Sequence, residues 1–378
     1  MKKTAPESTY VQSLPLPKFA LWDKFKPDRK PIAVEFEITA RCNNNCRHCY
    51  INQPASDRKA KQNELTLAEI GRIADQAADI GFLWWLITGG EPLLRKDFFD
   101  IYLLLRKKGF LISLFTNATL ISDEHIKFFK KYPPRNIEVS VYGASEKTYE
   151  AVTQVKGSFR FFNKGLERLL ENGFHVQLKA MALRSNFAEF PEIVRFCRKR
   201  SANHFRIDPF LHLRYDRDDQ RNRWIKEERL TTPEIIEIEQ LDPDRLMGLR
   251  QLCEVGSAKQ IKTTGRMPII GCGAGNNEFS LSYDGRLKLC LTLCHPDYEF
   301  DLHSGSLREA WFRFIPRVLN RKTRNKDLLE SCGVCLLRNL CQWCPASAML
   351  ETGELDRRID SFCATAHARA EWLKTRTD

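Results

Sequence analysis

The chain has 378 residues, of which 43% are hydrophobic and 29% charged, and its formal net charge is +12 at pH 7. This length is enough for one large domain and a smaller one, and no run reaches the ~18–20 apolar residues of a membrane-spanning helix. The two lysines of the opening "MKKTAPESTY" are not followed by an apolar core, so we expect no signal peptide and a cytoplasmic protein.

The basic residues occur in short, scattered runs such as "RKAK" and "RKR", not among aromatic residues. This pattern is typical of a solvated basic surface and does not indicate nucleic-acid binding. The excess of positive charge also suits an acidic protein partner, such as a small electron carrier.

Taken in chain order, residues 1–31 form an N-terminal arm, and residues 32–210 alternate strand-like and helix-like segments. The predicted strands are Ala33–Ile38, Leu83–Thr88, Leu111–Thr116, Asn136–Tyr142, His175–Ala182 and Phe205–Asp208. Each is mostly apolar on both faces, as is typical of parallel strands covered by helices. Six such βα units predict an α/β fold with a partial (β/α)6 barrel of the TIM type, in which functional residues lie at the carboxyl ends of the strands.

The segments between these strands carry helix start and stop signals. Thr66 and Glu69 have the spacing of a capping box before an apolar stripe. Gly81, Gly109 and Gly173 each stand where a helix should end before the next strand.

The remainder of the chain has a different texture. Residues 211–262 are highly charged with a few helical apolar positions, and we expect a charged helical linker. Residues 263–367 consist of short segments rich in Gly and Cys, so we expect a small domain stabilised by metal, followed by a tail at 368–378.

The thirteen cysteines are clustered, and in a reducing cytosol clustered cysteines more often bind metal than form disulfides. Cys42, Cys46 and Cys49 directly follow the first predicted strand. A structural zinc site needs four ligands, and His48 is the only other candidate nearby. A cubane iron–sulfur cluster is normally held by four cysteines, so three would leave one iron open at the barrel mouth.

This C-x3-C-x2-C pattern after the first strand resembles the radical S-adenosylmethionine (SAM) superfamily. The resemblance implies that the open iron chelates the amino and carboxylate groups of SAM. An electron from the cluster then cleaves the sulfonium, and the resulting 5′-deoxyadenosyl radical abstracts hydrogen from a substrate. His48 occupies the position before the third cysteine, where the superfamily carries an aromatic residue near the adenine.

Three further motifs at strand ends extend the resemblance. Gly89, Gly90 and Glu91 match the GGE motif that binds the amino group of SAM, and paired glycines allow close backbone approach. Asn117 stands at a Thr-Asn position after the third strand, where a turn-capping role is the alternative. Ser140 matches a serine near the ribose, but Tyr142 replaces the aspartate of the usual Ser-Leu-Asp-Gly.

The C-terminal cysteines resemble the SPASM extension of radical enzymes that mature peptides. By this resemblance Cys332, Cys335, Cys341 and Cys363 ligate one auxiliary [4Fe–4S] cluster, and Cys272, Cys290 and Cys344 ligate another. The fourth ligand of the latter is Cys294, Cys253, a substrate or none. A pair of zinc ribbons is the alternative, because C-x2-C repeats alone also suit zinc.

Together these features predict a radical SAM/SPASM enzyme with three [4Fe–4S] clusters that abstracts hydrogen from a peptide or protein, maturing a ribosomally synthesised peptide. The resemblance implies a separate recognition protein and an acidic electron donor such as flavodoxin or ferredoxin, with no nucleic-acid or membrane partner. The alternatives are a formylglycine-forming sulfatase-maturing oxidase, a small-molecule radical dehydrogenase and a simple electron-transfer protein. Asp208, which ends the sixth strand, is a possible acid or base, but no catalytic side chain is assigned.

Overall fold

A computed structural model describes residues 29–201, 205–257 and 267–375, so the predicted arm at 1–31 lies almost wholly outside the described residues. Its main feature is a nine-stranded sheet in the order β12-β11-β10-β1-β4-β5-β6-β7-β8. Six neighbouring strands run parallel: β1 (Ala33–Thr39), β4 (Trp84–Gly89), β5 (Leu111–Thr116), β6 (Asn136–Val141), β7 (Val176–Met181) and β8 (Arg206–Asp208). The six predicted strands and the α/β fold class are confirmed.

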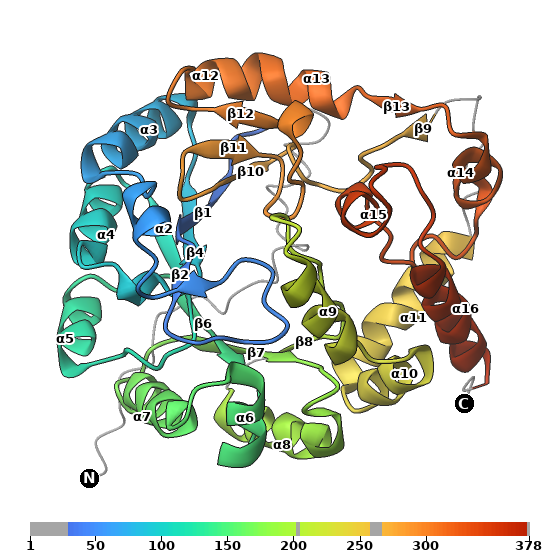
Figure 1. Cartoon of the computed structure of the whole chain (residues 1–378), viewed down its shortest axis with the longest axis horizontal. Coiled ribbons are helices and arrows are strands. Elements are labelled where there is room, and N and C mark those ends of the chain that lie inside the picture. The colour runs from blue at the N-terminus through green and yellow to red at the C-terminus, as the bar shows by residue number, and fades with distance from the viewer. Residues whose placement is uncertain (1–28, 202–204, 258–266, 376–378) are drawn as a thin grey trace, which may run out of the picture.

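Helices cover the outside of this curved sheet (Figure 1). They are α3 (Leu67–Ile80), α4 (Phe98–Lys107), α5 (Asp123–Lys131), α6 (Glu146–Thr153), α7 (Ser158–Glu171) and α8 (Phe190–Arg200). The predicted capping box begins α3, where Glu69 N donates to Thr66 Oγ1 and Thr66 N donates to Glu69 Oε2. Gly81 ends α3 with φ of 105°, a left-handed conformation that favours glycine.

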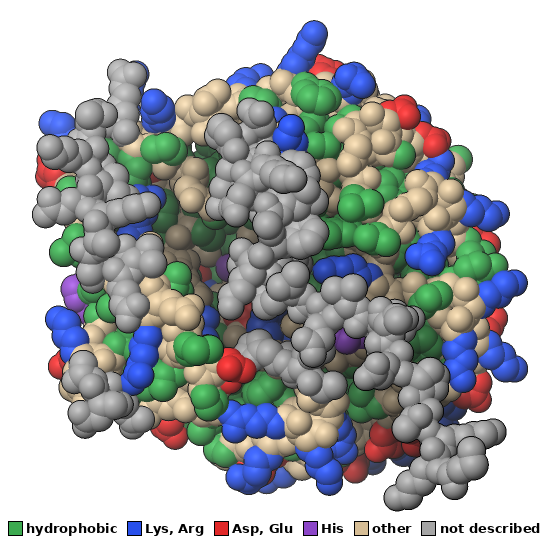
Figure 2. All heavy atoms as spheres, turned by 180° about the vertical axis from the view of Figure 1, so that it is seen from behind, with side chains coloured by type: hydrophobic (Ala, Val, Ile, Leu, Met, Phe, Trp, Pro, Cys, Tyr) green, Lys and Arg blue, Asp and Glu red, His purple; other side chains and the backbone are tan. Residues whose placement is uncertain are grey.

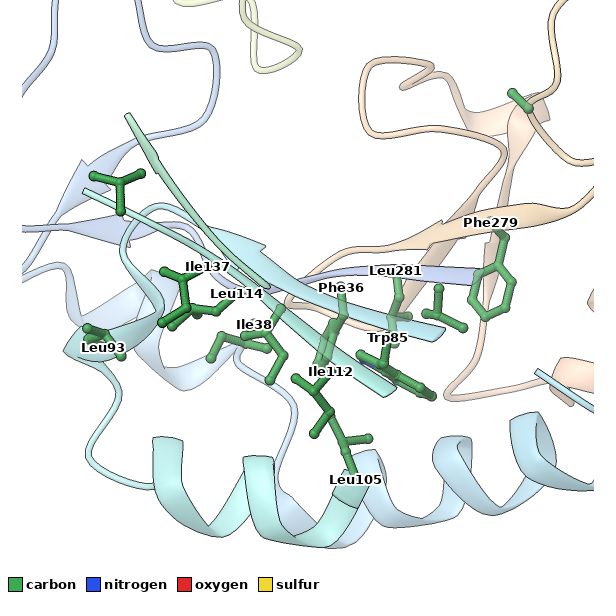
Figure 3. Packing of buried hydrophobic residues seen from close by; sticks show 14 of the residues in the cluster. Phe36, Ile38, Trp85, Leu93, Leu105, Ile112, Leu114, Ile137, Phe279 and Leu281 are labelled. Atoms are coloured by element: carbon green, nitrogen blue, oxygen red, sulfur yellow. The ribbon is translucent and has the colours of Figure 1, made fainter. Parts of the chain in front are cut away.

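The outer face of the strands is apolar, and the inner face differs from strand to strand. Figure 3 shows Leu105 of α4 pointing toward Ile112 and Trp85 of the sheet, which belong to the main core with Phe36. The expectation of apolar residues on both faces holds for β4 and β5, whose inner positions include Leu86 and Phe115. It is wrong for the other strands, whose inner positions are mostly polar because this face lines a cavity and not a second helical layer; they include Glu35, Glu37, Glu138, Ser140 and Lys179.

The cysteine-rich part continues the barrel sheet. Strand β10 (Glu278–Leu281) pairs parallel with β1, and β11 (Arg286–Lys288) and β12 (Glu299–Asp301) follow antiparallel. The helical run α12 (Leu307–Glu309), Ala310–Phe314 and α13 (Ile315–Leu319) packs beside these strands through Trp311, which contacts Phe82 and Phe279 edge-on or tilted. The core of the barrel thus extends into the segment predicted to be a separate small domain.

The predicted linker forms helices α9 (Asp219–Glu228), α10 (Thr232–Gln240) and α11 (Pro243–Ser257), which lie near the C-terminal helix α16 (Asp360–Lys374) in Figure 1. Glu239 of α10 and Arg369 of α16 are both buried, with Arg369 Nη2 2.6 Å from Glu239 Oε1. Arg369 Nη1 also donates to the carbonyl of Leu340 at 2.7 Å. A buried ion pair of this kind fixes two elements together, so α10 and α16 form one unit.

The remaining elements are short. They are β2 (Arg41–Cys42), β3 (Gln53–Pro54), α2 (Arg58–Gln62), β9 (Met267–Pro268), β13 (Lys322–Thr323), α14 (Lys326–Glu330) and α15 (Pro345–Thr352). Among the described helices, none has the length and apolar character needed to cross a membrane. On the face drawn in Figure 2, Lys and Arg side chains are spread around the rim among acidic and apolar ones.

Candidate active site

The carboxyl ends of the parallel strands open into a cavity of about 1340 Å³. The sequence-predicted residues that line it are Cys42, Cys46, His48, Cys49, Gly89, Gly90, Asn117, Ser140 and Asp208. They come from segments after β1, β4, β5, β6 and β8 that are far apart in the sequence. The structure thus places these residues in one cavity, at the end of the barrel where such folds carry their chemistry.

The three cysteines of this cavity lie on one loop between β2 and β3, which pair in parallel. Asn44 N donates to Cys42 Sγ and Asn52 N to Cys49 Sγ, each at 3.4 Å. Burial raises the pKa of the Cys42 and Cys46 thiols, so these groups need a bound cation to become thiolates at neutral pH.

The donor set of this loop fits a cubane iron–sulfur cluster. Three thiols among the described lining residues leave one of four irons open. No three Cys, His, Asp or Glu side chains in the described part of the chain converge on a point that one metal ion could occupy. Each thiolate of a cubane binds a different iron atom, so a cluster does not need that convergence.

Gly89 and Gly90 line the cavity, but the structure gives a different reason for their lack of side chains. A Cβ on Gly89 would lie 2.2 Å from the carbonyl oxygen of Thr39, and one on Gly90 would lie 2.3 Å from that of Arg41. The glycines therefore allow the loop after β4 to pack on the backbone that leads into the cysteine loop. They set the position of the cysteines as well as the wall of the cavity.

Glu91 is fully buried beneath this wall. Its carboxylate accepts hydrogen bonds from Thr116 Oγ1 (2.8 Å), the backbone N–H of Asn117 (2.8 Å) and that of Leu93 (3.1 Å). Burial raises the pKa of Glu91 to about 7, and these hydrogen bonds oppose that rise. A cation nearby would favour the ionised form.

Asn117 caps the turn after β5 and contacts the cysteine loop, while its role toward a cosubstrate stays a prediction. Its Oδ1 accepts from Thr119 N at 2.9 Å, which caps the turn, and its Nδ2 donates to Asn43 Oδ1 at 3.0 Å. The same Nδ2 is 3.8 Å from Cys42 Sγ. The turn after β5 is therefore joined to the cysteine loop.

His48 and Ser140 lie on the opposite side of the cysteines. The His48 ring packs against Tyr142 with 5.0 Å between ring centroids, and its Nδ1 is buried without a hydrogen-bond partner among the described residues. Burial lowers the pKa of His48 to about 4. His48 is thus a neutral ring at neutral pH, as an aromatic neighbour of a flat ligand should be.

Four charged residues form another wall of the cavity, and sequence reasoning had found only Asp208 among them. Lys179 Nζ is 3.3 Å from Asp208 Oδ2, and Arg206 Nη2 is 3.6 Å from Glu138 Oε1. All four residues line the cavity. The signal that could have found the others is that each lies at a polar position alternating with apolar residues along its strand.

Arg214, from the predicted linker, was also missed. Its side chain is buried, and Nη1 donates to Cys49 O (3.3 Å), Asn52 O (3.2 Å) and Asn52 Oδ1 (3.1 Å). Asp216 Oδ2 accepts from Arg214 Nη2 at 2.5 Å and holds the guanidinium in place. Arg214 therefore clamps the C-terminal end of the cysteine loop.

A second cavity of about 1020 Å³ lies in the cysteine-rich part. The cysteines that line it are Cys272, Cys332, Cys335, Cys341, Cys344 and Cys363. Burial raises the pKa of the Cys332 and Cys341 thiols, and for each the neighbouring cysteines of the set Cys332, Cys335, Cys341 and Cys363 add to the rise. The four thiols expected to share a cluster are therefore electrostatic neighbours.

The remaining C-terminal cysteines have different surroundings. Cys290 is close enough to Cys344 for that thiol to raise its pKa, after the larger effect of burial. Cys294 Sγ accepts from Lys288 Nζ at 3.1 Å, and Cys253 packs with Leu249 and Leu340 in a helical cluster that Cys341 adjoins. Whether either thiol is a fourth ligand stays a prediction.

Residues 36–197 match the family model described as the radical SAM superfamily. These residues are a radical SAM domain. The predicted recognition and the prediction of an enzyme are confirmed, and the family implies a [4Fe–4S] cluster and SAM as cofactors.

Relatives and solved structures match this chain over most of its length. The AdoMet-dependent heme synthase of Methanosarcina barkeri is 25% identical, covering 86% of this chain and 94% of its own. The subtilosin biosynthesis protein AlbA of Bacillus subtilis is 23% identical, covering 83% and 71%. SuiB of Streptococcus suis, in its complex with the precursor peptide SuiA, superposes with a TM-score of 0.66 at 17% identity, over 91% of this chain and 78% of SuiB. The last likeness shows the fold.

Proposed function

We propose that this radical SAM enzyme abstracts hydrogen from a peptide or protein and thereby matures a ribosomally synthesised peptide. The observation that carries the proposal is the second, cysteine-lined cavity beside the barrel, which fits the auxiliary clusters of peptide-maturing enzymes. AlbA, a bacteriocin biosynthesis protein, supports the same substrate class, as does the fold shared with a protein that binds a precursor peptide.

In this proposal Cys42, Cys46 and Cys49 hold the catalytic [4Fe–4S] cluster. With SAM bound, that cluster supplies a 5′-deoxyadenosyl radical. Glu91 faces the ammonium group of SAM through the GGE loop, and its buried carboxylate is already aligned by Thr116 and Asn117 N–H. The ammonium would lower the raised pKa of Glu91. His48 lies against the adenine.

The remaining lining residues bind either SAM or the substrate. Ser140 contacts the ribose, and Asn117 positions the turn beside Cys42. The charged wall of Lys179, Asp208 and Arg206 faces the substrate and can hold its polar groups. We assign Cys332, Cys335, Cys341 and Cys363 to one auxiliary cluster, and Cys272, Cys290 and Cys344 to the other.

The proposal also implies two protein partners. We propose a separate peptide-recognition protein and an acidic electron donor of the flavodoxin or ferredoxin type, which the net charge of +12 would attract. The formylglycine-forming oxidase and the small-molecule dehydrogenase stay as alternatives; the first differs in the reaction at a protein side chain and the second in the substrate.

A tetrapyrrole substrate is the second candidate, because the heme synthase of Methanosarcina barkeri matches over almost its full length. Lys179 and Arg206 in the cavity wall could hold carboxylate side chains of such a ring. The two candidates make different predictions for stimulation. A precursor peptide should accelerate 5′-deoxyadenosine release in one case, and an iron porphyrin in the other.

The test starts with the full chain, purified and reconstituted without oxygen. We expect ~12 irons per chain for three cubanes, and release of 5′-deoxyadenosine with dithionite. The variant Cys42→Ala should lose that release, while Cys197→Ala, a buried cysteine of α8 outside both cavities, should keep it. Zinc in place of iron, or intact SAM in the wild type, would overturn the proposal.

A further inference from the structure

A continuous line of hydrogen bonds joins the two cavities. His212 lines the active-site cavity, and its Nδ1 is 3.2 Å from Ser347 Oγ. Ser347 Oγ is in turn 3.2 Å from the Sγ of Cys344, which lines the second cavity. Ser347 N also donates to Cys344 Sγ at 3.3 Å. Ser347 is 4% exposed, so water does not interrupt the line.

The chemistry of Cys344 sets the direction of these bonds. A thiolate bound to iron can only accept hydrogen bonds. Ser347 must therefore donate its hydroxyl hydrogen to Cys344 Sγ, and its oxygen then accepts from the Nδ1–H of His212. A neutral imidazole carries one N–H, so Nε2 becomes its basic nitrogen. A fixed tautomer is what a proton acceptor needs.

Burial keeps His212 neutral, and the charges around it are paired. Four charged groups face it: Lys179 on β7, Asp208 on β8, Arg229 at the end of α9, and Glu351 on α15. Lys179 pairs with Asp208 and Arg229 pairs with Glu351, so each charge is matched. Burial is the larger effect and lowers the pKa of His212. The imidazole is therefore free to take a proton.

We propose that His212 is the proton acceptor of the active-site cavity and is linked through Ser347 to the cluster bound by Cys344. In this step a substrate that has already lost a hydrogen atom gives one proton to His212 Nε2 and one electron to that iron–sulfur cluster. The substrate thus loses two hydrogens in total. The proton goes to His212 and the electron to the cluster at Cys344, which are the two ends of the same line of hydrogen bonds. The inference rests on the proposed auxiliary cluster.

The test measures a cluster potential and needs no substrate. The full chain carries Cys42→Ala, Cys46→Ala and Cys49→Ala, so that only the C-terminal clusters give a signal, with ~8 irons expected for two cubanes. Midpoint potentials are followed by electron paramagnetic resonance from pH 6 to 9. We expect one potential to fall with pH over part of this range, approaching ~59 mV per unit for one proton per electron.

Three variants assign that slope. His212→Asn keeps a group at the Nδ1 position for Ser347 but cannot accept the proton, so the potential should become independent of pH at unchanged iron content. Ser347→Ala breaks the line and should reduce the slope. His367→Gln, a histidine that lines the second cavity, should keep the wild-type slope.

The outcomes separate the two proposals. Iron in the expected amount with a flat wild-type potential would overturn the role of His212 and leave the proposed function standing. A pH slope of the potential that survives in His212→Asn, or that disappears in His367→Gln, would also overturn the role of His212 and leave the proposed function standing. Failure to bind iron at the C-terminal cysteines would overturn both.

Discussion

Arg214 holds the cysteine loop from outside, and its removal should have a direct structural consequence for that loop. One nitrogen, Nη1, serves three oxygens of Cys49 and Asn52, so it makes the equivalent of about two hydrogen bonds to the loop. A hydrogen bond to a charged group contributes roughly 1.5–3 kcal/mol. Arg214→Met keeps the length of the side chain and removes the charge, so the loop should be held more weakly by about 3–5 kcal/mol.

Hydrogen exchange of the metal-free protein reports this loss. Because ~1.4 kcal/mol corresponds to a tenfold change in an opening equilibrium, peptides that contain Asn52 and Gln53 should exchange roughly 100-fold faster or more. Gln53 N donates to Ala40 O at 2.8 Å and is a suitable reporter. Peptides from α7 should be unchanged.

The matched control is Arg195→Met. Arg195 forms an exposed ion pair with Glu192 on α8, and exposed pairs contribute little. Unchanged hydrogen exchange at residues 49–54 in a folded Arg214→Met protein would refute the idea that Arg214 holds the cysteine loop in place. Iron binding should also fall in Arg214→Met, because the loop no longer holds Cys49 in place.

Three further predictions follow from particular contacts. Gly90→Ala should prevent cluster assembly, measured as iron per chain, because its Cβ would meet Arg41 O at 2.3 Å, whereas Gly248→Ala, whose Cβ meets nothing, should bind iron normally. Arg369→Leu removes one of the two arginine partners of the buried Glu239 and leaves Arg245 as the other, so thermal or urea unfolding should show a loss of about 1.5–3 kcal/mol, and Arg358→Leu at the surface should not. Burial, with Glu35 as neighbour, raises the pKa of Glu278 to about 7; the folded state then binds more protons, so stability falls as pH rises from about 4.5 to 7 by up to ~3 kcal/mol. Glu278→Gln should flatten that urea-unfolding profile, and an unchanged profile would contradict the assignment.

Most of the barrel could be predicted from local sequence patterns. Alternation at Val34, Phe36 and Ile38 and the Thr66–Glu69 capping box depend on near neighbours, and these signals can be read without the tertiary structure. The cysteine spacing after β1 likewise depends on one loop. For this reason the strands, the first helix and the cysteine loop were predicted well.

Pairings between distant segments could not be predicted in the same way. β10 adds to the open edge of β1, although Ala33 and Glu278 are far apart in sequence. Gly285, with φ of 80°, lies in the turn of the hairpin that β10 forms with β11. Nothing in that hairpin indicates which strand it will join, because the partner is chosen by a free sheet edge.

The segment 211–214 shows why the predicted linker has a functional role. Its contacts alternate from one residue to the next. Leu211 and Leu213 are buried with Val152 in a small apolar cluster. Facing the other way, His212 contacts Ser347, and Arg214 contacts the cysteine loop.

Two apolar anchors therefore hold two polar side chains in a fixed register between the cavities. A one-residue shift of this segment would exchange the anchored and the polar positions, so it would disturb both contacts at once. The short segment 211–214 thus contacts both the cysteine loop and Ser347, the neighbour of Cys344. Local sequence patterns predicted only a charged linker at this place.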